Sequence, residues 1–222
     1  SSHYRTSRMP SSAWKKKVNA HTLTSNVQKE KLNELYNYDA PNIEIIPPGV
    51  NIHTYHIPTE EEQKKETDLP DKYIFCLSRI DTNKGHDLLL YAFDKVRKEI
   101  NDIHLVIGGG SPNPKPREKS VFNKMKEIIK EKDMDRVHII GYVPDEKLVQ
   151  YYQQAELFVL PSIFEPFGMT SQEAMACGTP VVASKYGGIK HVITHDKNGI
   201  LINPEDAEEF ANGIIKLLKD DD

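Results

Sequence analysis

Two glutamates, Glu165 and Glu173, stand eight residues apart in the stretch 161–182 and are the first candidates for chemistry. The apolar run 157–160 predicts a buried strand just before this stretch, and a helical pattern begins near Gly168. The first turn of a helix presents free backbone N–H groups and the positive end of the helix dipole. We therefore expect the loop and the helix start to bind an anionic ligand.

Each glutamate also has a purely structural interpretation. Glu173 lies inside the expected helix, where it is either a solvated residue or a carboxylate that reaches vicinal hydroxyls, as in dinucleotide folds. Glu165 lies in the loop and either caps nearby N–H groups or contacts the ligand. The two need not be an acid/base pair, and a two-carboxylate glycosidase fits the expected parallel sheet poorly.

Two cations in the segment S-R-I-D-T-N-K-G-H (78–86) provide a second candidate group. Arg79 follows an expected strand and Lys84 precedes an expected helix, so both can converge on one anion. Arginine offers a bidentate fork and lysine a point charge. Exposed loop cations are common, so this segment indicates a phosphate site only together with the other loops.

The glycine segments 108–110 and 186–188 predict either tight turns or a close approach of backbone to ligand. Neither forms a dinucleotide fingerprint, and no Walker motif is present. The nine histidines are scattered, so the sequence predicts no metal site. A nucleophile elbow is also missing, which leaves no basis for a serine hydrolase.

Composition narrows the class of protein. The 222 residues carry a net charge of −4 and 38% apolar residues, which suits a folded α/β chain and not a general nucleic-acid binder. Cys76 and Cys177 lie in apolar patterns and are expected to be buried and unpaired. With neither a signal peptide nor a membrane span in the sequence, we expect a cytoplasmic location.

Strands and helices alternate from Lys72 onward, which predicts a doubly wound parallel sheet with ligands at the carboxyl ends of its strands. The expected strands are 73–77, 103–107, 137–140, 157–160, 180–184 and 199–202. The expected helices are one after Gly85 that includes Leu88 to Val96, then 121–132, 144–155, one from 168, and 204–218. Upstream we expect a helix at 11–20, a strand at 21–24, a helix to Tyr36 and a strand at 43–46.

The motifs together resemble the donor half of retaining glycosyltransferases of family 4, which have the GT-B fold. They are I-P-P-G-V-N (46–51), S-R-I-D-T-N-K-G (78–85), E-P-F-G-M-T-S-Q-E (165–173), G-T-P-V-V (178–182) and the glycine pair 187–188. The resemblance spans residues 21–219 and is nearest to the group of sucrose-phosphate synthase and mannosylfructose-phosphate synthase. It implies a Rossmann-like C-terminal half of a GT-B fold.

The resemblance also implies roles for single residues. Arg79 and Lys84 would hold the diphosphate, Glu173 the ribose hydroxyls, and Glu165 the donor sugar. The groups that complete the donor site would be Phe167, Gly168, Met169 and Thr170 around the helix start, and Gly109, Tyr142 and Val143 near the base. No metal or other cofactor is required. Negative charge develops on the diphosphate in the transition state. Removing one hydrogen-bonding group that contacts this charge would raise the activation free energy by about 3 kcal/mol.

The expected reaction is transfer of a hexosyl group from UDP-glucose or GDP-mannose, by same-face attack, to an acceptor such as fructose 6-phosphate. Residues 1–40 would be the tail of an N-terminal acceptor domain. Residues 41–70 would be a linker and the start of the C-terminal domain, and residues 71–222 the donor domain, truncated at its C-terminus. The missing domain would be the main partner, and this chain alone would be inactive. His3 remains without a role.

Other functions stay open. One is a transferase that acts on a lipid or polysaccharide acceptor, for which the run Lys15–Lys17 gives thin support as a membrane contact. Another is a non-catalytic module that binds nucleotide sugars on the same fold.

Overall fold

The structure is a computed structural model that describes residues 21–36 and 43–220. The expected helix at 11–20, His3 and the run Lys15–Lys17 lie outside the described residues. The chain divides into two compact units, Ser1–Pro48 and Gly49–Asp222.

The first unit contains two short parallel strands and one helix. Strand β1 (His21–Leu23) pairs with β2 (Ile43–Ile45), with the helix α2 (Asn26–Tyr36) between them in sequence. All three elements lie where the sequence predicts them. Ser25, just before α2, caps the helix: its hydroxyl accepts a hydrogen bond from the backbone N–H of Gln28 at 3.3 Å.

The second unit is built on a six-stranded sheet in which every pairing is parallel. Its order is β5-β4-β3-β6-β7-β8, so the chain winds outward from β3 in one direction and from β6 in the other. The strands are β3 (Tyr73–Leu77), β4 (His104–Gly108), β5 (Val137–Gly141), β6 (Leu157–Leu160), β7 (Val181–Ser184) and β8 (Ile200–Ile202). The expected doubly wound parallel sheet is confirmed.

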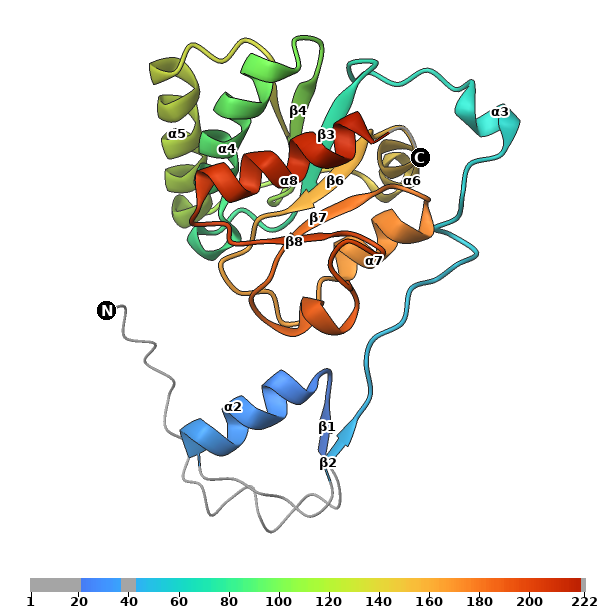
Figure 1. Cartoon of the computed structure of the whole chain (residues 1–222), viewed down its shortest axis with the longest axis vertical. Helices are drawn as coiled ribbons and strands as arrows, with labels where there is room; N and C mark the ends of the chain where they lie inside the picture. Colours follow the sequence, from blue (N-terminus) through green and yellow to red (C-terminus); the bar gives the residue numbers. More distant parts are fainter. Residues whose placement is uncertain (1–20, 37–42, 221–222) are drawn as a thin grey trace. The chain divides into compact units, whose positions relative to one another are not determined.

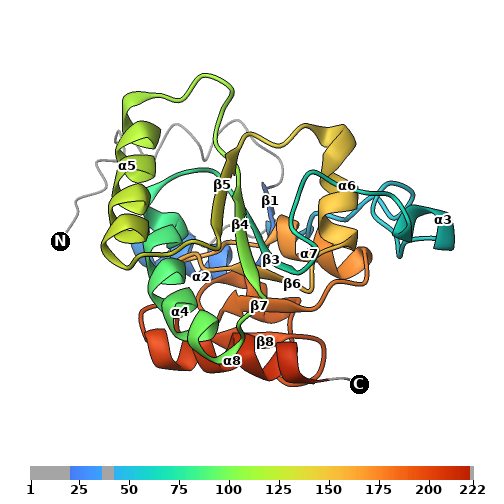
Figure 2. The same ribbon diagram turned by 90° about the horizontal axis from the view of Figure 1, so that it is seen from above.

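Helices cover both faces of this sheet (Figures 1 and 2). One face packs against α4 (His86–Glu99), α5 (Pro116–Glu131) and α8 (Ala207–Lys219). The other packs against α6 (Asp145–Gln153) and α7 (Met169–Ala176). Two short 3-10 turns complete the unit, Thr82–Lys84 before α4 and Gly188–His191 after β7.

Two helix starts differ from the sequence prediction. Helix α5 begins at Pro116, not at Val121, and the Glu118 carboxylate accepts a hydrogen bond from the backbone N–H of Lys115. Helix α8 begins at Ala207, not at Pro204, because the Asp206 carboxylate accepts from two N–H groups of the first turn. In both cases a local capping contact sets the boundary.

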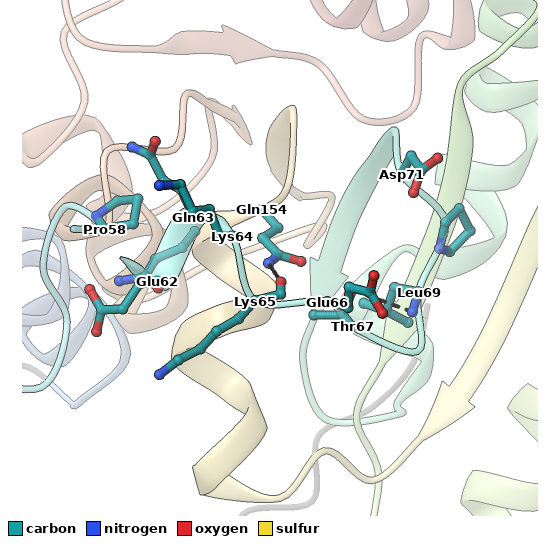
Figure 3. A pocket seen from close by; sticks show the side chains of 12 residues that line it. Pro58, Glu62, Gln63, Lys64, Lys65, Glu66, Thr67, Leu69, Asp71 and Gln154 are labelled. Carbon is teal, nitrogen blue, oxygen red and sulfur yellow. Dashed lines mark hydrogen bonds between the residues drawn. The ribbon is translucent and has the colours of Figure 1, made fainter. Parts of the chain in front are cut away.

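Hydrogen bonds from glutamine side chains hold the segment 49–72 against the C-terminal end of α6. Gln153 donates its amide to the carbonyl of His56 at 2.9 Å, and Gln150 and Gln154 donate to the carbonyl of Lys65. The segment includes the one-turn helix α3 (Glu60–Gln63) and borders an open groove of about 590 Å³ (Figure 3). This groove lies beside the C-terminal end of α6, so it is remote from the carboxyl ends of the strands.

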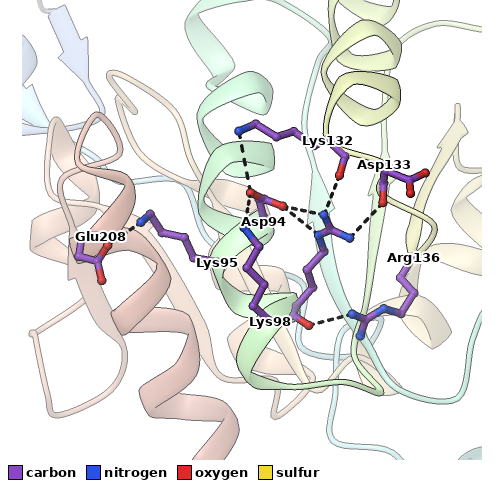
Figure 4. A network of polar contacts seen from close by, with 8 residues as sticks. Asp94, Lys95, Lys98, Lys132, Asp133, Arg136 and Glu208 are labelled. Carbon is purple, nitrogen blue, oxygen red and sulfur yellow. Dashed lines mark hydrogen bonds and ion pairs between the residues drawn. The ribbon is translucent and has the colours of Figure 1, made fainter.

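A polar network ties α4 to α5 (Figure 4). Asp94 of α4 is buried and accepts hydrogen bonds from Arg97 and Lys98, with Lys132 at 4.0 Å. Arg97 also donates to the carbonyl of Lys132 at the end of α5, and Arg136 donates to the carbonyl of Arg97. Carbonyls at both helix ends are thereby satisfied.

The apolar core is split by the sheet into two clusters, one on each face. Cys76 lies in the first and Cys177 in the second; both are buried and unpaired, as expected. In residues 21–36 and 43–220, every helix is too short or too polar to cross a membrane.

Candidate functional site

The loops that follow β3 and β6 lie side by side because these strands are neighbours in the sheet. Their junction is where the winding of the sheet reverses, which is the usual ligand site in such folds. The backbone N–H of Ile163 donates to the carbonyl of Asn83 at 3.0 Å. A Cβ at Gly85 would lie 2.1 Å from the carbonyl oxygen of Pro161, so only glycine permits this approach.

The loops bring Lys84 and Glu165 together in a buried ion pair. The Lys84 Nζ lies 2.8 Å from Oε2 of Glu165, and the two side chains are only 11% and 12% exposed. The same oxygen accepts the hydroxyl of Ser162 at 3.0 Å. The other oxygen, Oε1, accepts the backbone N–H of Gly168 at 3.2 Å, just before α7. Glu165 therefore both pairs with a cation and caps the helix start.

The main chain of Glu165 is fixed as well. Its N–H donates to the carbonyl of Tyr186 at 3.1 Å, and its carbonyl accepts from the N–H of Gly188 at 2.9 Å. A Cβ at Gly187 would lie 2.0 Å from the carbonyl oxygen of Glu165. The glycine pair 187–188 therefore has a structural role, because residues without a Cβ allow the turn after β7 to pack directly against the backbone of Glu165.

Arg79 behaves differently from Lys84. It lies just beyond β3 and is exposed. Among the described residues it has neither a hydrogen bond nor an ion-pair partner by side chain, unlike Lys84. Its charge is accordingly available to a ligand without breaking an internal contact.

The start of α7 is shaped by Gly168, which has φ +79° and packs against Ile189. Phe167 and Gly168 are buried, whereas Met169 and Thr170 are half-buried. Helix geometry leaves the N–H groups of the first turn without intrahelical partners. The loop and helix start thus offer N–H groups next to the Lys84–Glu165 pair.

Glu173 lies farther along α7 and has a partner of its own. The hydroxyl of Tyr152 in α6 donates to Oε2 of Glu173 at 2.8 Å. Burial raises the pKa of Glu173, the Tyr152 bond opposes this, and the charge of Asp145 adds to it. The two glutamates are therefore held by different partners.

The residues expected near the base occupy the ends of β4 and β5. Gly109 donates its N–H to the carbonyl of Gly141 at 2.7 Å, and a Cβ there would meet the carbonyl oxygen of Ser78 at 1.7 Å. Val143 is buried in the core, so its side chain is structural. Tyr142 is 50% exposed and is the side chain of this group that a ligand can reach.

Metal ligands do not gather in the described part of the chain. No three His, Cys, Asp or Glu side chains there are arranged to hold an ion. The candidate site consists of two cations, two carboxylates and a helix start. Sequence reasoning missed Tyr152 and Ser162, because each is an ordinary residue for its element and only the fold brings it to a glutamate.

This chain is similar in sequence or in fold to three known proteins. Mannosylfructose-phosphate synthase of Agrobacterium fabrum is 34% identical over 200 residues, which is 88% of this chain and 44% of that protein. The structure of sucrose-phosphate synthase from Thermosynechococcus elongatus matches with a TM-score of 0.75 at 30% identity, over 90% of this chain and 49% of that one. The structure of Anabaena Alr3699/HepE in complex with UDP and glucose matches with a TM-score of 0.79 at 24% identity, covering 90% and 54%.

The last of these similarities concerns the fold alone, and it agrees with the expected half of a GT-B fold. The chain spans about half the length of the curated relatives it matches. Residues 58–222, which include both cations and both glutamates, match the family model described as glycosyl transferases group 1. The chain belongs to this family of glycosyltransferases.

Proposed function

We propose that this chain forms the donor-binding half of a retaining glycosyltransferase of family 4, which moves a hexosyl group from a nucleotide sugar to an acceptor. The observation that carries the proposal is the buried Lys84–Glu165 pair at the start of α7. It lies at the junction of β3 and β6, where a parallel sheet of this type binds its ligand.

In this proposal the diphosphate binds between Arg79, Lys84 and the N–H groups of Met169 and Thr170. Cleavage of the bond from the anomeric carbon to the phosphate increases negative charge on the leaving diphosphate. Fixed cations and N–H dipoles stabilise that charge more in the transition state than in the bound donor. Because these groups supply the electrostatic stabilisation, the proposed reaction needs no metal or other cofactor.

Glu165 is proposed to contact the donor sugar, and Glu173 the ribose hydroxyls. Glu165 is suited to this position because Lys84 balances its charge and four further hydrogen bonds fix its side chain and main chain. Tyr142 and the backbone of Gly109 border the region proposed for the base. The half-exposed tyrosine ring provides a surface on which a base can stack.

The donor is proposed to be UDP-glucose or GDP-mannose, and the acceptor a sugar phosphate such as fructose 6-phosphate. The support for the acceptor class is the similarity to mannosylfructose-phosphate synthase and sucrose-phosphate synthase. Support for a uridine nucleotide comes from the UDP complex of a protein with the same fold.

A transfer assay tests the proposal. The intact protein is incubated with each donor and with fructose 6-phosphate, and the anomeric configuration of the product is read by NMR. The proposal expects one donor to be used with retained configuration and Lys84→Ala to lower the rate at least about 100-fold. Binding of the donor without transfer to any acceptor would instead favour the non-catalytic module.

A further inference from the structure

The side chain of Glu173 has one hydrogen-bond partner among the residues that the structure describes, and that partner, Tyr152, is buried. The hydroxyl of Tyr152 donates to Oε2, and the Tyr152 side chain has no solvent exposure. The second oxygen, Oε1, accepts no hydrogen bond from this part of the chain, and Glu173 itself is half-buried. One oxygen is thus held and the other remains for a ligand.

The ring of Tyr152 is held on several sides. Its centroid lies 5.5 Å from that of Phe75 and 5.4 Å from that of Phe158, both in edge-on contacts with the sheet. Tyr55 packs edge-on against it at 6.0 Å from the segment before α3. The carbonyl of Tyr152 accepts the hydroxyl of Thr179 at 2.6 Å. The phenol therefore cannot follow Glu173 into another rotamer and instead fixes its position.

We propose that Tyr152 is a positioning residue: it holds Oε2 of Glu173 so that Oε1 receives the vicinal hydroxyls of a nucleotide ribose. The inference rests on the proposed function, in which Glu173 contacts that ribose. A long carboxylate side chain that is already ordered loses less conformational freedom when the ligand binds. Tyr152 therefore contributes to ribose recognition without touching the nucleotide.

Helix α6 provides a matched control in the adjacent residue. Tyr151 is also buried, and its hydroxyl also donates to a carboxylate, Oδ1 of Asp68, at 2.7 Å. Asp68 lies in the segment before β3, outside the site described above. Tyr151→Phe and Tyr152→Phe remove the same chemical group from the same helix, and only the second removes a contact to Glu173.

The test compares the affinities for UDP and 2′-deoxy-UDP by calorimetry, or for the guanosine pair if the protein prefers guanine. We expect the unaltered protein and Tyr151→Phe to bind the ribonucleotide more tightly than the deoxyribonucleotide. Tyr152→Phe should lose about fivefold to tenfold of that preference, while the affinity for the deoxyribonucleotide changes little. If Tyr152→Phe prefers the ribonucleotide as strongly as Tyr151→Phe does, the inference is overturned.

Glu173→Asp tests the same claim without altering Tyr152, because the shorter side chain keeps its charge but cannot reach the phenol in place. It should lose at least as much preference as Tyr152→Phe, because the shorter side chain also withdraws its carboxylate from the ribose, and the double variant should lose no more than Glu173→Asp alone. Additive losses would contradict a shared mechanism. If the unaltered protein shows no ribose preference, the role of Glu173 fails and so does the inference; if it binds no nucleoside diphosphate, the proposed function fails first.

Discussion

Lys84 and Glu165 form a direct ion pair at 2.8 Å although 81 positions separate them in the sequence. The pair joins the loop after β3 to the loop before α7, and both side chains are largely buried. A buried pair of this kind loses more when one partner is removed than when both are replaced by neutral groups.

The first prediction follows from this asymmetry. Lys84→Met leaves the Glu165 carboxylate buried without its cation and should lower the free energy of unfolding by about 3 kcal/mol. The double variant Lys84→Met/Glu165→Gln should regain most of this stability, because no uncompensated charge remains. Denaturant unfolding of the three proteins measures both effects. Equal losses in the single and double variants would show that the pair is not coupled.

Substitution of Arg79, unlike substitution of Lys84, should affect nucleotide binding and leave the stability of the fold unchanged. Since Arg79 is exposed and has no internal partner in the described part of the chain, Arg79→Ala should leave the melting temperature unchanged. It should weaken the affinity for a nucleoside diphosphate about tenfold, and this loss should shrink in high salt. Lys126→Ala, at an exposed position on α5, is the matched control and should change neither quantity. An affinity unaffected by Arg79→Ala would remove Arg79 from the site.

Gly187 tests the geometry that holds Glu165. A Cβ at Gly187 would collide with the carbonyl oxygen of Glu165, and φ is +108°. Gly187→Ala should therefore cost about 2 kcal/mol or more of stability and displace the Glu165 loop. Gly49→Ala is the control, since nothing lies within 4 Å of a Cβ there. Thermal unfolding compares the two, and similar values for both variants would contradict the close approach at Gly187.

Asp94 provides a prediction on pH dependence. Burial alone would raise the pKa of Asp94, but hydrogen bonds from Lys98 and Arg97 outweigh it and hold the pKa below its ordinary value. A carboxylate with a lowered pKa in the folded state stabilises the fold above its unfolded pKa. This contribution is lost as the pH falls through the folded pKa.

Asp94→Asn should accordingly reduce stability by about 2 kcal/mol at neutral pH, and by less in acid. Urea unfolding at pH 7 and below pH 4 measures this difference. The exposed Asp102, paired with Lys72, is the control, and Asp102→Asn should change little at either pH. A destabilisation by Asp94→Asn that is the same at both values would refute the electrostatic origin.

The sequence predicts the sheet well because its central strands are continuous apolar runs. The strands 73–77 and 157–160 have the predicted bounds, since each is a short apolar run that ends where a polar or proline-containing loop begins. The starts of α5 and α8 were less predictable, because Glu118 and Asp206 resemble ordinary polar residues until their capping contacts are seen.

The sequence named the candidate site residues but not the contacts between them. That Lys84 meets Glu165 depends on β3 lying next to β6, while β4 and β5 intervene in sequence. The resemblance to a family supplied candidate roles, and the ion pair itself emerges only from the fold. Tyr152 was missed because a tyrosine on the inner face of an amphipathic helix is usually a core residue.

We propose above all that the junction of β3 and β6 binds a nucleoside diphosphate through Arg79, Lys84 and the start of α7. Calorimetric titration of the protein with UDP, GDP and ADP tests it most directly. We predict micromolar affinity for one of the three, at least about tenfold weaker binding of the others, and loss of binding in Lys84→Met/Glu165→Gln. No binding of any nucleotide, or equal binding by the double variant, would contradict the account.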